Sequence, residues 1–468
     1  MLAGFFAACH KGDVPDPVTD NKTQASEITK KVNNFIFEAM DYYYLWYDQM
    51  PDIDYNYETD SKEYFYKLLY DQEDKWSFIT DDIDALLNSF QGIEKTYGWS
   101  LAFGQFYDSN KNPTGTYFAV VEFVYPNTPA ATAGIKRGDI IMAINGGDIT
   151  QDNYTDLLNG ENLTFTMGEL TNNGISEGST VTLSALELNL NPVVKTSLIN
   201  YEGKKIGYLF YAQYIDNYND ALDTALQSLH NQGAEDIVLD LRYNPGGQIS
   251  AAQHLCSILA PKDAVDEEKI LVTFRWNDKR QKEYEDGQIM DDIQTNFDKQ
   301  VPLNLNLSRL YVLTGSGTAS ASELTITGLE PYMNNNVITV GDTTYGKYTA
   351  SITLRPTAQF PNYDEIKNWG LQPIVLRYAN AYGVTDFKNG FAPDILVKDD
   401  LLDAYPLGDM NDPLLAATIE DITGTPVISA VKSARMTHPQ YRIIDRGFSR
   451  FDSNKRELLI DNKEIFKE

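Results

Sequence analysis

The chain has 468 residues, 42% of them hydrophobic and 12% aromatic, which is enough for more than one packed core. Its formal net charge of -29, with no basic stripe interleaved with aromatic residues, argues against nucleic acid as a partner. Its two cysteines are too few for a disulfide framework or a cysteine-rich zinc site. The sequence therefore predicts a soluble, acidic protein of several domains.

The first residues, MLAGFFAAC, place small side chains directly before Cys9. This string resembles the end of a bacterial lipoprotein signal, which implies lipid modification of Cys9 and a polar tether up to residue 25. No apolar stretch approaches the ~20 residues needed to span a bilayer, so membrane attachment would be through that lipid alone. The implied location is the bacterial cell envelope, on its periplasmic or outer-membrane side; an ordinary frayed apolar N-terminus is the alternative.

Residues 26–96 place apolar side chains at intervals of three and four, which predicts a helical region. The aromatic cluster Tyr42, Tyr43, Tyr44 and Trp46 is interpreted as core packing.

Residues 97–195 change to short alternating segments punctuated by Gly, Asn and Pro, which predicts a mostly β module. Within them, VVEFVYPNTPAATAGIKRGDIIMAINGGDI indicates a strand, a short helix over residues 129–133 and a second strand over residues 139–144. This string resembles the PDZ domains of bacterial envelope proteases.

PDZ domains bind extended peptide C-termini by adding a strand to a sheet edge. The resemblance implies that YGWSLAFG, residues 97–104, forms the carboxylate loop, with Leu101, Ala102, Phe103 and Gly104 binding the peptide. A module that only packs against its neighbours is the alternative.

Residues 196–425 alternate strand, helix and strand, which predicts an α/β core. KKIGYLFYAQ and DIVLDLR read as strands, and an amphipathic helix lies between them. Cys256, in the apolar run HLCSILAP of a following helix over residues 249–259, is expected to be buried.

The buried strand DIVLDLR ends in the glycine-rich element DLRYNPGG, residues 240–247, whose backbone amides could face an anion. Its spacing fits neither a P-loop nor a dinucleotide fingerprint. It resembles the corresponding element of the tail-specific, or carboxyl-terminal processing, serine proteases of peptidase family S41. The resemblance implies a crotonase/ClpP-like protease core and an oxyanion hole that includes the amides of Gly246 and Gly247.

The next strand leads into TASASE, residues 318–323, followed by a helix. Ser320 and Glu323 have the spacing of a capping box, which needs no further role. A serine at a strand-to-helix junction is also exposed beside amides that can stabilise an oxyanion. The resemblance makes Ser320 the nucleophile and the Ala321 amide an oxyanion donor, with Ser322 as the second choice.

None of the four histidines, at positions 10, 230, 254 and 438, lies in a motif typical of a catalytic triad. A lysine can replace histidine as the base if burial depresses its pKa. Lys347, after the strand in NNVITVGDTTYG, matches the lysine of the same family. The family's third residue, Gln or Glu four positions later, is Ser351 here, and Thr349 is a substitute.

The combined prediction is a multidomain α+β serine endopeptidase that cleaves envelope proteins or peptides with apolar C-termini and needs no metal or organic cofactor. The alternatives are a weakly active or inactive peptide- or ligand-binding protein on the same fold, and an envelope scaffold. GFAPDILVKDDLL resembles the family's closing segment, whereas residues 426–468 carry no interpretable signal. The oligomeric state is open.

Overall fold

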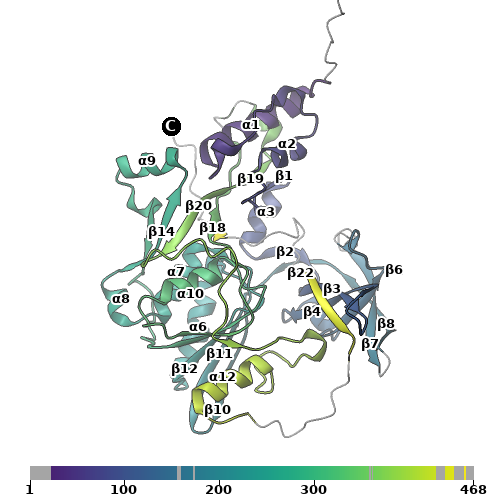
Figure 1. Cartoon of the computed structure of the whole chain (residues 1–468), viewed down its shortest axis with the longest axis vertical. Helices are drawn as coiled ribbons and strands as arrows, with labels where there is room; N and C mark the ends of the chain where they lie inside the picture. The colour runs from purple at the N-terminus through teal and green to yellow at the C-terminus, as the bar shows by residue number, and fades with distance from the viewer. Residues whose placement is uncertain are drawn as a thin grey trace, which may run out of the picture.

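The computed structural model describes residues 23–154, 160–171, 174–357, 360, 362–427, 438–446 and 458–459. An N-terminal helical region, a β-rich domain and an α/β core follow one another along the chain (Figure 1). The lipidation site predicted at Cys9 lies outside the described residues. Within those residues, no helix has the length and apolar character needed to cross a membrane.

The N-terminal region consists of α1 (Glu27–Tyr43), α2 (Ser61–Leu68) and α3 (Ile83–Phe90), with 3-10 turns at Tyr47–Gln49 and Tyr55–Tyr57. Each α-helix begins after a side chain that accepts hydrogen bonds from first-turn amides, namely Ser26, Asp60 and Asp82. A short strand interrupts the predicted helical region. This strand, β1 (Phe78–Thr80), pairs antiparallel with β19 (Gly370–Gln372) and so joins the region to the core.

The aromatic cluster at the end of α1 packs as predicted at three of its four positions. Tyr43, Tyr44 and Trp46 are buried, but Tyr42 is 37% exposed. The Tyr42 hydroxyl donates to Glu283 at 2.6 Å, because Tyr42 faces the charged helix α9 (Asp278–Asp286) at the surface. The packing interpretation is therefore wrong for Tyr42.

The β-rich domain is one twisted antiparallel sheet. It contains β3 (Trp99–Tyr107), β4 (Pro113–Val124), β5 (Ile140–Ile144), β6 (Gly147–Asp148), β7 (Asn162–Thr171) and β8 (Gly174–Ser184), with α4 (Pro129–Thr132) between β4 and β5. The ladder of β2 (Ile93–Thr96) with β9 (Leu186–Asn189) holds the entering and leaving chain together. At the free edge of β3, β22 (Gln440–Arg446) is added from the far end of the sequence.

The α/β core is built on a six-stranded sheet. Its order is β10 (Val193–Tyr201), β11 (Lys204–Tyr211), β12 (Asp236–Asp240), β16 (Leu310–Thr314), β17 (Val337–Gly341) and β21 (Ile395–Leu396). All pairs from β11 to β21 are parallel, and β10 is an antiparallel edge.

Helices cover both faces of this core sheet. α6 (Asn219–Asn231), α7 (Ile249–Leu259) and α10 (Ala321–Leu329) share one apolar core with α1 and α2, and α8 (Lys262–Asp266) packs there too. α12 (Pro413–Thr423) covers the other face, beside the β-rich domain. Cys256 is buried in α7, where burial raises the pKa of its thiol to about 12.

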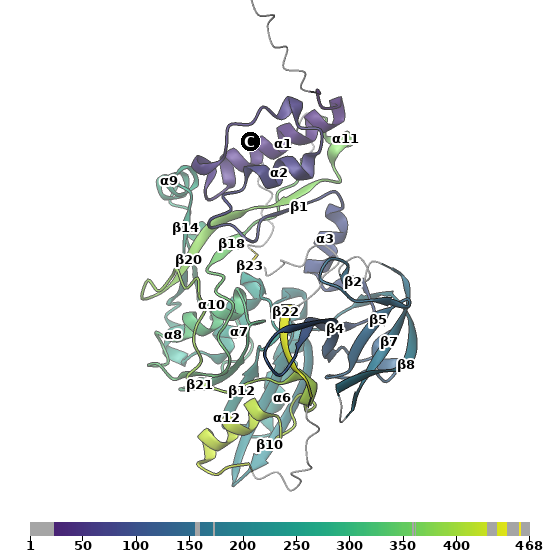
Figure 2. The same cartoon turned by 45° about the vertical axis from the view of Figure 1, so that its right-hand side comes forward.

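A second sheet lies across the carboxyl ends of the core strands (Figure 2). Its order is β13 (Gly247–Gln248), β23 (Leu458–Leu459), β18 (Thr349–Ser351), β20 (Ile374–Asn380), β14 (Ile270–Trp276) and β15 (Gln294–Asn296). The remaining short elements are α11 (Tyr363–Ile366) and 3-10 turns at Asp216–Tyr218, Met290–Asp292 and Leu401–Asp403.

The parallel sheet determines where the predicted catalytic segments meet. β12, β16 and β17 are neighbours, and each is followed by one of the loops that carry the predicted residues. Because the strands are parallel, these loops leave from the same edge of the sheet. The glycine-rich element and the segment with Lys347, a hundred residues or more apart in the sequence, are thereby brought together.

Candidate active site

Ser320 lies between β16 and α10 in a strained backbone conformation. Its φ of 63° and ψ of -114° are unusual for a residue with a side chain. The side chain is fully buried, and its hydroxyl has no hydrogen-bond partner among the residues described. A buried, unpaired hydroxyl costs free energy, so its retention in a strained turn is typical of a functional position.

The Glu323 carboxylate joins the backbone of Ser320 to that of Lys347. Its Oε2 accepts from the Ser320 amide at 2.8 Å and from the Lys347 amide at 2.9 Å. Its Oε1 accepts from the Gly346 amide at 2.6 Å and the Thr344 hydroxyl at 2.7 Å. The capping-box prediction thus holds for the Glu323 side, while Glu323 also spans two loops.

The Tyr378 hydroxyl forms a second bridge between the same two residues. It lies within 3.2 Å of the Ser320 carbonyl and 3.1 Å of the Lys347 carbonyl, and Tyr378 is fully buried in β20. With Glu323 on the amides and Tyr378 on the carbonyls, the backbones of Ser320 and Lys347 are held at a fixed relative position.

Lys347 lies two residues before β18 and is buried, with 1% of its surface exposed. Its Nζ lies 5.9 Å from the ring centroid of Trp76, which comes from the N-terminal region. The N-terminal region therefore contributes an aromatic wall next to the predicted base, a contribution that the sequence analysis did not foresee.

The position predicted for the third catalytic residue, Ser351, is linked to a glutamine from another strand. The Gln372 Nε2 donates to the Ser351 Oγ at 3.1 Å, and the Gln372 Oε1 accepts from the Thr353 hydroxyl at 2.8 Å. Gln372 is buried at the end of β19. Thr349, the predicted substitute, is buried with an unpaired hydroxyl among the described residues.

The glycine-rich element follows β12 and turns sharply at Gly247. The φ of Gly247 is 138°, and a Cβ there would lie 2.1 Å from the Tyr214 carbonyl oxygen, so only glycine fits. Asn244 ties the element to the Ser320 loop, because its carbonyl accepts from the Ala319 amide at 3.1 Å. The Gly246 amide donates to the Asn244 Oδ1 at 2.9 Å, so this predicted oxyanion donor is already engaged.

The alternative catalytic groups have structural partners of their own. Ser322 donates its hydroxyl to the Asn244 carbonyl at 3.1 Å. His254 pairs with Asp223 at 2.7 Å, and His438 pairs with Asp400 at 3.0 Å. These contacts leave Ser320 as the better candidate for a free nucleophile.

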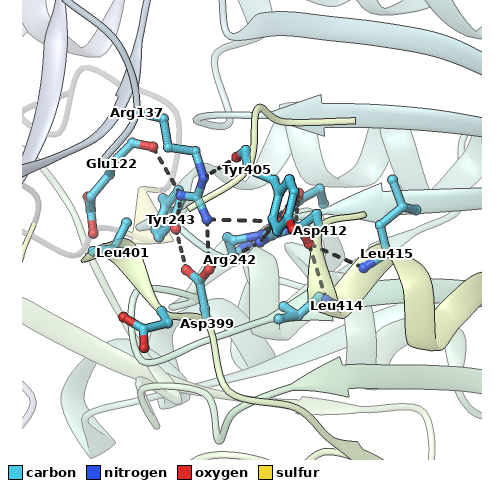
Figure 3. Close-up of polar contacts among 12 residues, drawn as sticks. Glu122, Arg137, Arg242, Tyr243, Asp399, Leu401, Tyr405, Asp412, Leu414 and Leu415 are labelled. Atoms are coloured by element: carbon cyan, nitrogen blue, oxygen red, sulfur yellow. Dashed lines mark hydrogen bonds and ion pairs between the residues drawn. The ribbon is translucent and has the colours of Figure 1, made fainter. Parts of the chain in front are cut away.

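A buried ionic cluster includes residues of the glycine-rich element itself (Figure 3). Arg242 binds Asp412 through two hydrogen bonds, of 2.9 and 3.0 Å, and its Nε lies 3.0 Å from Asp240. Arg137 of the β-rich domain binds Asp399 at 2.7 Å and donates to the Tyr243 hydroxyl. The cluster therefore connects the β-rich domain to the segment that carries Gly246 and Gly247.

Burial alone would raise the pKa of Asp399, but Arg137 and Arg242 outweigh it and hold that pKa well below its usual range. Tyr243 donates a hydrogen bond to the same carboxylate, which acts in the same direction. Asp399 is therefore a stable anion between the two arginines.

The residues predicted to bind a peptide lie in β3. Ala102, Phe103 and Gly104 are paired with β22, and Leu101 pairs on the other side with Val121 of β4. Leu101, Ala102 and Phe103 have buried apolar side chains, so these residues can contact a peptide chiefly through backbone hydrogen bonds along the edge of β3.

Four residues of the site were missed or given a lesser role. Glu323 was interpreted only as a helix cap, and Tyr378, Gln372 and Trp76 were not considered. The TASASE motif signals Glu323, whereas the other three come from segments without any local motif. Among the described residues, no group of three or more His, Cys, Asp or Glu side chains could hold a metal ion.

Replacing Glu323 with glutamine should lower kcat/KM by about 10- to 100-fold, since misplacing catalytic groups by ~1 Å costs that much. Burial raises the pKa of Glu323 to about 7, although its hydrogen bonds oppose the shift. The carboxylate accepts four hydrogen bonds, and protonation weakens this bridge. Wild-type activity should therefore fall as the pH drops through about 7, and Glu323→Gln should lose the part of this fall that comes from the carboxylate, whereas the part that comes from protonation of the predicted base Lys347 should stay. An unchanged profile would exclude the bridging role.

Three parts of the chain match known family profiles. Residues 205–397 match the family described as Peptidase family S41, residues 31–78 match the Peptidase S41 N-terminal domain, and residues 120–165 match the PDZ domain. These matches coincide with the α/β core, the N-terminal helical region and the β-rich domain.

The chain is similar in sequence to proteins of several bacteria. The carboxyl-terminal-processing proteases of Synechocystis sp. and Picosynechococcus sp. are 25% and 26% identical to this chain, over 66% and 69% of its length. The match spans 65% of the first relative and 71% of the second. A crystal structure from Bacteroides fragilis assigned to the S41 proteases is 29% identical, with a TM-score of 0.64. It covers 83% of this chain and 97% of that one.

Proposed function

We propose that this chain is a serine endopeptidase that uses Ser320 as nucleophile and Lys347 as general base, because residues 205–397 match Peptidase family S41 and residues 120–165 match the PDZ domain. The observation that carries the proposal is the double bridge of Glu323 and Tyr378, which holds the backbones of these two residues together.

In the proposed reaction the Ser320 Oγ attacks the carbonyl carbon of the scissile peptide bond, and its proton passes to the Lys347 Nζ. Backbone amides of Gly247 and Ala321 stabilise the oxyanion of the tetrahedral intermediate. The amine product leaves with the proton from Lys347, and water then hydrolyses the acyl-enzyme by the same route. Buried lysines are the ones that serve as general bases in proteins, and Lys347 is buried.

Ser351 is proposed as a positioning residue. Its hydroxyl is held by Gln372, which is itself held by Thr353, so the end of β18 is fixed by a chain of side-chain hydrogen bonds. Gln372 thereby supplies, from β19, a buried amide close to where the family carries its Gln or Glu.

The substrates we propose are proteins or peptides with apolar C-termini, delivered by the PDZ domain. The names of the cyanobacterial relatives, carboxyl-terminal-processing proteases, support this class. The resemblance of the sequence around Cys9 to a lipoprotein signal supports a lipid-anchored location in a bacterial envelope, which metabolic labelling with palmitate would test.

Replacing Lys347 with methionine should reduce cleavage of an unfolded protein by about 10³-fold or more, in line with the ~10²- to 10⁴-fold contribution of a positioned base. Fragments would be counted by mass spectrometry over time. Lys282→Met is the matched control, since the Lys282 side chain is 75% exposed and its loss should leave the rate unchanged. Equal cleavage by wild type and Lys347→Met would contradict the assignment, and no cleavage by the wild type would favour a binding protein.

A further inference from the structure

The C-terminal extension, residues 438–446 and 458–459, pairs with both surfaces where a peptide substrate would be expected. β22 lies antiparallel along β3, with Ile443 opposite Gly104 and Arg446 opposite Ala102. Figure 1 shows β22, in yellow, along the edge of the PDZ sheet. Strand addition at a free sheet edge is how PDZ domains bind their ligands, so β22 takes the place of a ligand.

Side chains fix β22 on this edge in addition to the backbone pairing. The Tyr154 hydroxyl donates to Asp445 at 2.7 Å, and Arg446 forms an ion pair with the buried Glu122 at 2.5 Å. The Tyr441 ring packs edge-on against Phe118, with ring centroids 5.8 Å apart. β22 is therefore a specific contact with defined partners.

Arg446 also reaches toward the catalytic core. Its guanidinium lies 5.8 Å from the ring centroid of Tyr243, in the glycine-rich element. A Cβ on Gly317 would lie 3.7 Å from the Arg446 Cδ, so its stem packs against the loop that leads to Ser320. β22 thus ends next to the two loops that form the candidate active site.

β23 lies between β13 and β18, the strands that follow the glycine-rich element and the loop with Lys347. Leu458 and Leu459 pair in parallel with Gly247 and Gln248 on one side, and Leu459 pairs with Ser351 on the other. One neighbour carries the proposed oxyanion donor, and the other begins two residues after Lys347. A substrate backbone that pairs with these strands has to occupy the place of β23.

We propose that the C-terminal extension is an intramolecular inhibitor, which occupies the PDZ edge through β22 and the catalytic cleft through β23 and is displaced by substrate. This inference rests on the proposed peptidase function for its effect on activity, but not for the docking itself. Two linked contacts of one segment raise its effective concentration at each site, so a substrate must compete with both.

The test uses the full chain with Ile443→Pro and Leu458→Pro, because proline removes a backbone donor and disfavours strand pairing. We expect kcat/KM for an unfolded protein substrate to rise by about tenfold or more, as the competent fraction increases. Ile444→Ser is the control, since Ile444 lies at the bulge of β22 and is 39% exposed. An unchanged or lower kcat/KM in a folded double-proline chain would overturn the proposal.

A binding measurement separates this proposal from the peptidase function. The double-proline chain also carries Ser320→Ala, and a fluorescent peptide of residues 438–468 is followed by anisotropy. We expect the peptide to bind the double-proline chain. The same peptide should bind the Ser320→Ala chain with an intact extension at least about tenfold more weakly. A peptide that itself carries the two prolines should not bind. Equal affinity for both chains, or no binding to either, would overturn the docking. Binding without cleavage by any form would support the docking and contradict the peptidase function.

Discussion

Ser320→Ala should reduce cleavage of an unfolded protein by about 10⁴-fold or more, because the reaction loses its nucleophile. Ser322→Ala should retain activity within about 10-fold of the wild type, since that hydroxyl donates to the Asn244 carbonyl and plays a structural part. Both rates would be measured with the same substrate by mass spectrometry.

The pair is informative because the two serines share a motif and both are buried. Ser320 has an unpaired hydroxyl in a strained turn, whereas the Ser322 hydroxyl is hydrogen-bonded. If Ser322→Ala lost all activity and Ser320→Ala kept it, the nucleophile would be Ser322. The amides of the glycine-rich element would then have to stabilise an oxyanion formed next to Ser322.

Arg242→Met should lower the free energy of unfolding by about 3–5 kcal/mol, as expected when one partner of a buried ion pair is removed. Arg242 is 1% exposed, and its loss leaves Asp240 and Asp412 buried without their main counter-charge. Denaturation by urea, followed by circular dichroism, would measure the change in the transition of the α/β core.

Arg309→Met is the matched control for this measurement. Arg309 also binds an aspartate through two hydrogen bonds, to Asp236 at 2.6 and 2.9 Å, but its side chain is 37% exposed. A partly exposed pair of this kind contributes about 1 kcal/mol or less. A loss of similar size in both variants would show that burial of the ionic cluster does not determine its contribution.

The same cluster also determines how the core responds to acid. The pKa of Asp399 is held below its ordinary value of 3.8, so its contribution to stability is complete above that pH and is lost as the pH falls through the lower, folded pKa. Without Arg242 the folded pKa of Asp399 rises, and acid unfolding of Arg242→Met should begin at higher pH than in the wild type.

The periodic spacing of apolar residues along the chain made much of the fold predictable. The helix predicted over residues 249–259 coincides with α7, because an apolar face begins after the glycines and ends before Pro261. The strand predicted over residues 139–144 becomes β5, and the short helix predicted before it, over residues 129–133, becomes α4. In such segments, local periodicity and turn residues agree with the tertiary structure.

The predicted residues of the site were found through motifs, and its supporting residues could not be. Tyr378 and Gln372 act on Ser320, Lys347 and Ser351 only because β19 and β20 fold back beside them. β22 pairs with β3 across more than three hundred residues of sequence, so nothing local signals the contact. Contacts of this kind depend on the topology of the whole chain.

The most direct measurement of the central claim identifies the residue that becomes acylated. The full chain and its Ile443→Pro, Leu458→Pro form would be treated with a peptidyl β-lactone, which leaves an acyl group on a reactive serine, and digested for mass spectrometry. We expect the acyl group on Ser320, more of it in the double-proline form, and none in Lys347→Met. An acyl group on another residue, or equal labelling of Lys347→Met, would contradict a serine peptidase that depends on Ser320 and Lys347.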